Sequence, residues 1–218
     1  MMLNIPKTKY MLFNFTRNQK FSTRLEINGN ILENVNEIKL LGTIITDNLK
    51  WDANTRYLVK RAYARMELLR KVATFSRSIR DKLDIYKTYV RSVLEQSCVV
   101  WNSSITQKNE HDIERVQRIA FRLIYGTRHS YENILKKYNL QTLKERRDNL
   151  TTNFAKKCTK NKKTKGMFIE NKTKHNMKLR NTKKYNETKA MTKRLKQSSI
   201  PAMERILNEQ YKQKLNTF

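Results

Sequence analysis

The side chains that could perform acid–base or metal chemistry are scattered along the chain. Asp47 and Asp52 fall in a predicted turn without an acidic neighbour on a strand, so they do not form the carboxylate pair that a phosphoryl-transfer metal site requires. Cys98 and Cys158 are far apart and have no further ligand at metal-binding spacing, which fits a reducing compartment. The three histidines are also isolated from one another: His111, His129 and His175.

Motifs for covalent catalysis and nucleotide binding are missing from the sequence as well. Ser103 and Ser104 lack the glycine pattern of a nucleophile elbow. The chain has only 4 glycines and no glycine-rich phosphate loop. The sequence therefore predicts no catalytic residue, no metal site and no cofactor in this chain.

Positive charge is the strongest compositional signal. The chain carries 47 Lys and Arg against 19 Asp and Glu, a net charge of +28. Residues 1–52 hold 7 basic and 5 acidic residues, residues 53–150 hold 21 and 10, and residues 151–218 hold 19 and 4. Because so large a charge opposes a compact state unless a polyanion offsets it, nucleic acid is the first partner to expect.

The basic residues of the central region interleave with aromatic ones. Between residues 53 and 75 the only acid is Glu67, whereas ordinary solvated helices balance the two signs. Tyr57, Tyr63 and Tyr86 are spaced among these charges and either stack on bases and sugars or pack in the core. The pattern predicts contact with phosphates rather than base readout.

The first 52 residues predict a small antiparallel sheet. Residues 9–15 are apolar on both faces, as in a strand covered on both sides, and residues 23–28 alternate. Asn28-Gly29 is a hairpin-turn signal. Residues 40–45 are apolar and β-branched, which indicates a short buried strand that Gly42 interrupts with a bulge. A helix then starts, with Asp52 or Asn54 as its expected cap.

From residue 53 the apolar pattern takes a helical period. One helical face carries Leu58, Ala62, Met66, Leu69 and Ala73. Further helices are predicted around residues 83–94, 109–125, 131–138 and 143–158, and Gly126 is the expected end of the second of these. Leu143, Leu150 and Phe154 are expected to face inward. These patterns predict an α+β fold, mostly α, with a small antiparallel sheet at the N-terminus followed by a helical bundle.

The C-terminal region changes composition again. Residues 156–197 are rich in Lys, Asn and Thr without a period, which predicts disorder in the free chain. Residues 199–214 recover a helical pattern with Pro201 in the first turn. Three parts are expected: 1–52 with the strands, 53–155 as a helical domain, and 156–218 as a largely disordered basic tail with a short helix. No segment is apolar enough to span a membrane and no signal peptide is apparent, which indicates nucleus or cytoplasm.

Six short segments stand in a fixed order along the chain. They are Leu3-Asn4 with Lys7-Thr8, Met11 and Phe13; Leu41-Gly42 with Leu49 and Trp51; Ile85-Tyr86 with Tyr89-Val90, Ser92, Leu94-Glu95 and Val100-Trp101; Glu114, Gln117 and Ala120; Leu140, Leu143 and Arg146-Arg147; and Ser198 to Pro201 with Leu207-Asn208. Together they resemble the C-terminal part of reverse transcriptases from non-LTR (LINE-type, jockey-like) retrotransposons. The matched motifs are the strand after the catalytic hairpin, the primer grip, the thumb and the characteristic ending.

The resemblance covers nearly the whole chain and implies an RNA-directed DNA polymerase. The family's fingers and the palm strands with the Asp-Asp hairpin would lie upstream of Met1, so the upstream region of the same polymerase is an expected partner. Mg²⁺ is expected only in that complete polymerase, and this chain is expected not to polymerise alone.

The resemblance also implies roles for single residues. Lys7 would lie near the phosphates of the incoming nucleotide, and Leu41 with Gly42 would position the primer 3′ end. The helix with Lys60, Arg61 and Arg65 would follow a template–primer duplex of RNA and DNA. The remaining residues expected to bind nucleic acid are Lys39, Arg70, Lys71, Arg118 and Arg122.

Two alternatives to an inactive polymerase fragment stay open. One is a stand-alone basic RNA- or DNA-binding protein derived from such an element. The other is a helical interaction module whose charge serves anionic proteins. In either polymerase-derived case the strands look like the edge of a larger palm, so residues 1–35 are expected to be poorly ordered or to aggregate in the isolated chain.

Overall fold

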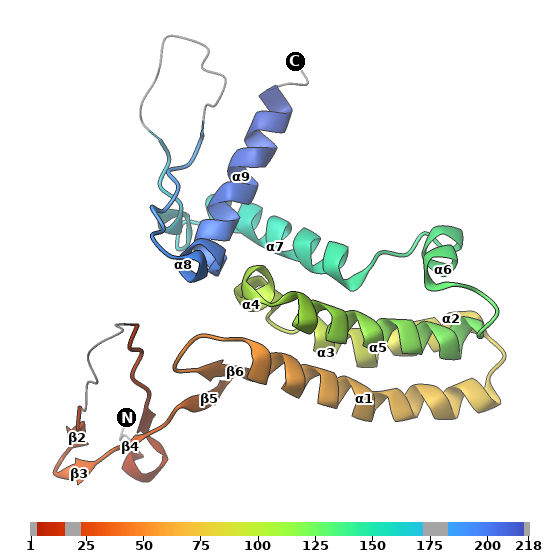
Figure 1. The fold of residues 1–218 in the computed structure, drawn as a ribbon, viewed down its shortest axis with the longest axis horizontal. Coiled ribbons are helices and arrows are strands. Elements are labelled where there is room, and N and C mark those ends of the chain that lie inside the picture. Colours follow the sequence, from red (N-terminus) through yellow and green to blue (C-terminus); the bar gives the residue numbers. More distant parts are fainter. Residues whose placement is uncertain (1–3, 16–22, 172–182, 216–218) are drawn as a thin grey trace.

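The computed structural model describes residues 4–15, 23–171 and 183–215. Short strands occupy the N-terminal end, and helices make up most of the rest (Figure 1). This confirms the predicted α+β, mostly α fold class. Within the described ranges, no helix combines the length and the apolar character needed to cross a membrane.

The first strands form two separate pairs instead of one sheet. After the 3₁₀ turn η1 (Ile5–Lys7), β1 (Lys9–Tyr10) pairs in parallel with β4 (Glu33–Asn34), so an all-antiparallel sheet was the wrong prediction. β2 (Glu26–Ile27) and β3 (Asn30–Ile31) form the predicted hairpin. Asn28 and Gly29 both have positive φ there, as a type I′ turn requires.

A strand forms only at Lys9–Tyr10, so the predicted strand over residues 9–15 is wrong from residue 11 onward. No strand runs through residues 11–15, and the Phe13 and Phe15 side chains are 44% and 55% exposed. The Arg194 guanidinium lies 5.5 Å from the centre of the Phe15 ring. The polar connector expected at residues 17–20 lies outside the described residues.

A second hairpin replaces the strand expected through residues 40–45. β5 (Glu37–Leu40) pairs antiparallel with β6 (Thr43–Thr46), and Leu41 and Gly42 between them both have positive φ. The chain therefore reverses at Gly42 instead of bulging, because two adjacent residues with positive φ make a type I′ turn. The Ile44 backbone N–H donates to the Asn54 side chain at 3.0 Å, which fixes the hairpin to the next helix.

That helix, α1 (Asp52–Phe75), buries the predicted face except at its last position, Ala73, which is half-buried. Leu58, Ala62, Met66 and Leu69 are at most 1% exposed. The predicted cap is wrong: Trp51 precedes the helix without a side-chain cap bond. Asn54 is occupied by the hairpin, and the Asp52 carboxylate accepts a 2.9 Å hydrogen bond from Asn109 on α5.

The helices after α1 follow the predicted order. α2 (Ile79–Ile85), the π-helical turn η2 (Tyr86–Arg91) and α3 (Ser92–Leu94) run on from one another, and α4 (Cys98–Trp101) and η3 (Asn102–Ser104) are short. α5 (Gln107–Tyr125) ends at Gly126 as predicted and packs along α1 (Figure 1). α6 (Tyr131–Lys137) and α7 (Leu143–Lys160) complete this part.

A buried amide joins these helices. Gln117 on α5 is 1% exposed, and its side-chain oxygen accepts a 2.5 Å hydrogen bond from the Tyr86 hydroxyl on η2. Its amide nitrogen donates to the Tyr131 hydroxyl at 2.7 Å and to the Gln141 carbonyl at 3.1 Å. Gln117 therefore links α5 to η2, to α6 and to the segment that enters α7.

Glu114, one turn before Gln117, fixes the start of α7. Its carboxylate accepts the Leu143 backbone N–H at 3.1 Å and the Tyr131 hydroxyl. A carboxylate at a helix N-terminus meets unpaired backbone donors and the positive end of the helix dipole. Thr142 and Glu145 add a capping box at the same helix end.

The buried face of α7 differs from the prediction. Leu143 is buried, but Leu150 and Phe154 are 37% and 40% exposed. After Leu143 the buried positions are Arg147, Thr151, Ala155 and Cys158, so Thr151 and Ala155 each follow a predicted inward position by one residue. The Arg147 guanidinium lies over the Trp101 ring at 5.7 Å and donates to Asn102 at 2.9 Å, so a cation occupies a position that an apolar pattern does not mark.

The described part of the tail is folded, which contradicts the predicted disorder of residues 156–197. The 3₁₀ turn η4 (Lys165–Met167) and α9 (Ser199–Leu215) pack with α7, and α8 (Lys193–Gln197) packs with α9 and η3. Phe168 and Tyr185 are buried against each other, and the Asn208 amide pairs with both backbone groups of Tyr185. The predicted helix after residue 199 is confirmed, whereas residues 172–182 lie outside the described structure.

Gln117→Ala is expected to lower the free energy of unfolding by about 2–4 kcal/mol. The change leaves the buried Tyr86 hydroxyl unpaired and opens a small cavity. Denaturant unfolding followed by circular dichroism measures the loss. Arg115→Ala, an exposed position on the same helix, is the control and should change stability by no more than about 0.5 kcal/mol. Equal losses in the two variants would contradict a structural role for this amide.

Candidate nucleic-acid interface

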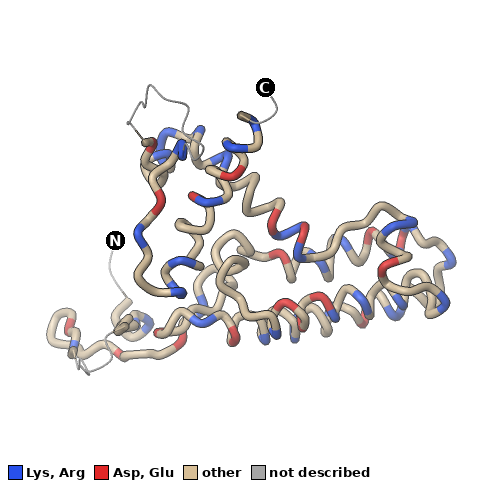
Figure 2. Tube along the Cα trace, turned by 45° about the horizontal axis from the view of Figure 1, so that its top comes forward, with Lys and Arg blue, Asp and Glu red and all other residues tan. Residues whose placement is uncertain are grey.

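The residues expected to bind nucleic acid do not form one surface. Figure 2 shows basic residues along the whole molecule, with acidic residues between them. Four of the expected residues gather around the tip of the β5–β6 hairpin: Lys39, Leu41, Gly42 and Arg61. We call these four, with Tyr57 and Gln96, the hairpin-tip cluster.

Gln96 fastens the hairpin tip to α1. Its amide nitrogen donates to the Leu41 carbonyl at 3.2 Å, and its amide oxygen accepts from Arg61 at 3.0 Å. A side chain at Gly42 would collide with this amide. The Leu41 side chain is 90% exposed, so the tip presents an apolar side chain to solvent while its backbone is held.

Tyr57 contacts two cations in the same cluster. The Lys39 ammonium lies 4.7 Å from the centre of its ring, and the Arg61 guanidinium lies 5.3 Å from it. The hydrogen bond from Lys39 lowers the pKa of the Tyr57 hydroxyl, and the charge of Arg61 acts in the same direction, against desolvation. One aromatic ring thus orders two positive charges that come from different elements.

The other basic residues of α1 serve different purposes. Arg65 donates to the Tyr89 carbonyl at 3.0 Å, and Arg70 pairs with Glu67 within its own helix. Lys60 and Lys71 are exposed and lie three helical turns apart on one face. That face is turned away from Arg61 and Arg65 by about a quarter turn or more.

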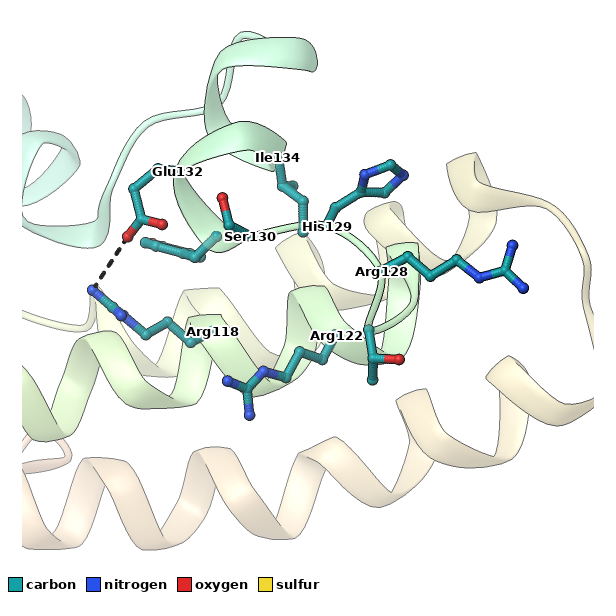
Figure 3. A pocket seen from close by; sticks show the side chains of 9 residues that line it. Arg118, Arg122, Arg128, His129, Ser130, Glu132 and Ile134 are labelled. Carbon is teal, nitrogen blue, oxygen red and sulfur yellow. Dashed lines mark ion pairs between the residues drawn. The ribbon is translucent and has the colours of Figure 1, made fainter.

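The remaining expected residues lie elsewhere. Arg118 and Arg122 line a cavity between α5 and α6 (Figure 3). Lys7 ends η1, which leads into β1 and its pairing with β4 instead of with the hairpin. The structure therefore brings together Lys39, Leu41, Gly42 and Arg61 and leaves the others apart.

Sequence reasoning missed Gln96 and left the tyrosines undecided. Gln96 lies just after α3, and no local sequence pattern indicates that it binds a turn far away in the sequence. Tyr86 is 1% exposed and bonded to Gln117, so it belongs to the core and not to a stacking surface. Tyr57 was among the candidates, and its position beside Lys39 is visible only in the fold.

Groups suited to nucleophilic or metal chemistry are not gathered in the described ranges. Both cysteines are buried and unpaired, and desolvation raises the pKa of the Cys98 thiol to about 11. Residues 4–15, 23–171 and 183–215 contain no group of three or more His, Cys, Asp or Glu side chains that could hold a metal ion.

Comparison of the sequence with protein-family models, with curated proteins and with solved structures finds no match in any of the three. A functional proposal therefore has to come from the residues of this chain and their arrangement.

Gly42→Ala is expected to lower the free energy of unfolding by about 2–3 kcal/mol. An alanine at a left-handed φ costs about 1–2 kcal/mol, and displacing Gln96 removes hydrogen bonds worth roughly 1 kcal/mol more. In a Gln96→Ala background only the backbone cost should remain, so the loss should shrink to about 1–2 kcal/mol. A double-mutant cycle by denaturant unfolding measures this, and identical losses in both backgrounds would contradict the Gln96 tether.

The pKa of Tyr57 is expected to lie below the ordinary tyrosine value and to rise in Lys39→Ala. The variant removes the donor and the cation that favour the charged phenolate, so deprotonation is pushed to higher pH. NMR of ¹³Cζ-labelled tyrosine, assigned with Tyr57→Phe, measures the titration. Lys71→Ala removes a charge from another face of α1 and should leave this pKa unchanged; a Lys39→Ala titration identical to wild type would refute the pairing.

Proposed function

We propose that this chain binds nucleic acid through the sugar–phosphate backbone, with the hairpin-tip cluster as its contact surface. The observation that carries the proposal is the Lys39–Tyr57–Arg61 arrangement, in which two cations from different elements flank one ring at the tip of a tethered hairpin. Long cationic side chains that are already positioned lose less conformational entropy when they meet phosphate.

The chemistry of the cluster suits a nucleic-acid backbone. Lys39 supplies a point charge, and Arg61 supplies a planar donor group for phosphate oxygens. Leu41 supplies an exposed apolar side chain that can rest against a sugar or base. The net charge of +28 adds long-range attraction to any polyanion.

The resemblance to non-LTR reverse transcriptases indicates which nucleic acid to test first. The residues that resemble the primer grip, Leu41-Gly42, are those at the hairpin tip. We therefore propose a template–primer duplex of RNA and DNA as the ligand, bound without catalysis by this chain alone. A stand-alone RNA- or DNA-binding protein would bind equally well to duplexes of other composition, and an interaction module would bind acidic proteins instead.

The experiment is a binding titration over a salt series. Fluorescence anisotropy with labelled RNA–DNA hybrid, duplex DNA and single strands gives the affinity and its dependence on salt. If about three to five phosphates are contacted, the logarithm of the binding constant should fall with the logarithm of salt concentration with a slope near −3 to −4.5. Hybrid is expected to bind most tightly, and equal affinity for all duplexes would favour the stand-alone alternative.

Lys39→Ala/Arg61→Ala should weaken binding by roughly tenfold or more and reduce the slope by about 2, since two phosphate contacts are lost. The matched control, Lys156→Ala/Lys157→Ala, removes the same charge from exposed positions on α7 and should have a much smaller effect. Equal effects of the two pairs would show that net charge alone drives binding. Primer extension with Mg²⁺ in the same tubes is expected to yield no product, and absence of binding at low salt would overturn the proposal.

A further inference from the structure

A basic cavity lies at a different place from the hairpin-tip cluster. It has a volume of about 520 Å³ and opens between the C-terminal half of α5 and α6 (Figure 3). Ile134, which is buried, contributes the apolar side chain of its lining. Its polar lining consists of Arg118, Arg122, Thr127, Arg128, His129, Ser130, Tyr131 and Glu132.

The fold holds the wall of this cavity at both ends. Gly126, at a φ of +84°, turns the chain after α5, and its N–H donates to the Arg122 carbonyl at 3.0 Å. At the other end the Ser130 side chain accepts from the Asn133 N–H at 3.2 Å and starts α6. The Tyr131 hydroxyl is bound to Gln117 in the core, which sets the position of α6 against α5.

The cations around the cavity exceed the acids that could neutralise them. Figure 3 shows the Arg118 and Arg122 side chains extending from α5, with Glu132 across from Arg118, and the Arg128 side chain pointing away from both arginines. Within the described ranges, the side chains of Arg122 and Arg128 have no hydrogen-bond or ion-pair partner. Arg118 lies over the Tyr131 ring at 4.7 Å and meets Glu132 at 3.9 Å, an exposed contact at the edge of ion-pair range.

Arg118 is therefore oriented by an aromatic ring while its charge is only weakly engaged. Arg122 presents a second planar donor group from the next turn of the same helix face. Hydroxyl groups from the loop add donors of a kind that also suits an anion. This combination favours a compact ligand with several oxygens and more than one negative charge.

We infer that this cavity binds the terminal phosphate of a nucleic-acid strand, an inference that rests on the proposed function. A phosphomonoester carries close to two charges and three free oxygens, whereas an internal phosphodiester carries one charge and two free oxygens. The cavity is concave, so it suits a chain end better than a backbone that must pass across a surface. It would anchor a strand end while the hairpin-tip cluster contacts the backbone elsewhere.

The test compares oligonucleotides that differ only at their ends. Binding of one sequence with a 5′-phosphate, a 3′-phosphate or hydroxyl ends is measured by anisotropy at fixed salt, with the fluorophore at an internal position. A phosphorylated end is expected to bind about tenfold more tightly than hydroxyl ends, the gain expected from one or more charge-assisted hydrogen bonds. Comparison of the 5′- and 3′-phosphates identifies which end is recognised.

Two variants locate the effect. Arg122→Gln should reduce the preference for a phosphorylated end, and Arg118→Gln/Arg122→Gln should abolish it. Arg115→Gln, an exposed arginine on α5 outside the cavity, should weaken all ends equally and keep the preference. All three positions are exposed, so circular dichroism should show wild-type folding.

The outcomes separate this inference from the proposed function. Salt-sensitive binding with no preference among the ends would overturn the inference and leave the proposed function standing, as would a preference that survives Arg118→Gln/Arg122→Gln. No binding of any oligonucleotide would overturn both. If a phosphoserine peptide binds as tightly as the phosphorylated strand, the cavity binds a phosphomonoester on a protein, and the nucleic-acid assignment is overturned.

Discussion

Gln117 lies in the middle of the helical part with almost no exposed surface, so both ends of its amide must find partners inside the protein. They find them on three other segments: the Tyr86 hydroxyl, the Tyr131 hydroxyl and the Gln141 carbonyl. Apolar packing of α1 against α5 tolerates some sliding, but a buried amide with directional partners does not. Gln117, together with Glu114, therefore sets the positions of α6 and of the start of α7, and the cavity between α5 and α6 depends on them in turn.

A second glutamine performs a similar task near the surface. Gln96 connects the Leu41 carbonyl to Arg61, so the hairpin tip and α1 move as one unit. Its bonds are partly exposed to solvent and are weaker constraints than those of Gln117.

Only some of the basic side chains have a partner within the fold. Arg65 and Arg70 are occupied by a carbonyl and a carboxylate, and Arg147 is buried over Trp101, where burial lowers its pKa. Lys39 and Arg61 are ordered by an aromatic ring without an acid to neutralise them. Lys39 and Arg61 at the hairpin tip, and Arg122 between α5 and α6, are not paired with an acid, and this distinguishes the proposed binding surfaces from the balanced charge around them.

Local patterns determined the helices and one turn. The apolar face of α1, the end of α5 at Gly126 and the Asn28-Gly29 hairpin could all be predicted, because each depends on side chains close together in sequence. The Leu41-Gly42 turn could not, since leucine is an uncommon residue at positive φ and Gln96 holds it from far along the chain.

The same limit explains the other differences. Arg147 is buried because it contacts the Trp101 ring and donates a hydrogen bond to Asn102. The described tail is folded because Phe168 and Tyr185 pack against α9. The sequence by itself determined which segments are helical and that the chain is strongly basic. Only the tertiary structure decided which cations lie together, because the partners that orient them come from distant segments.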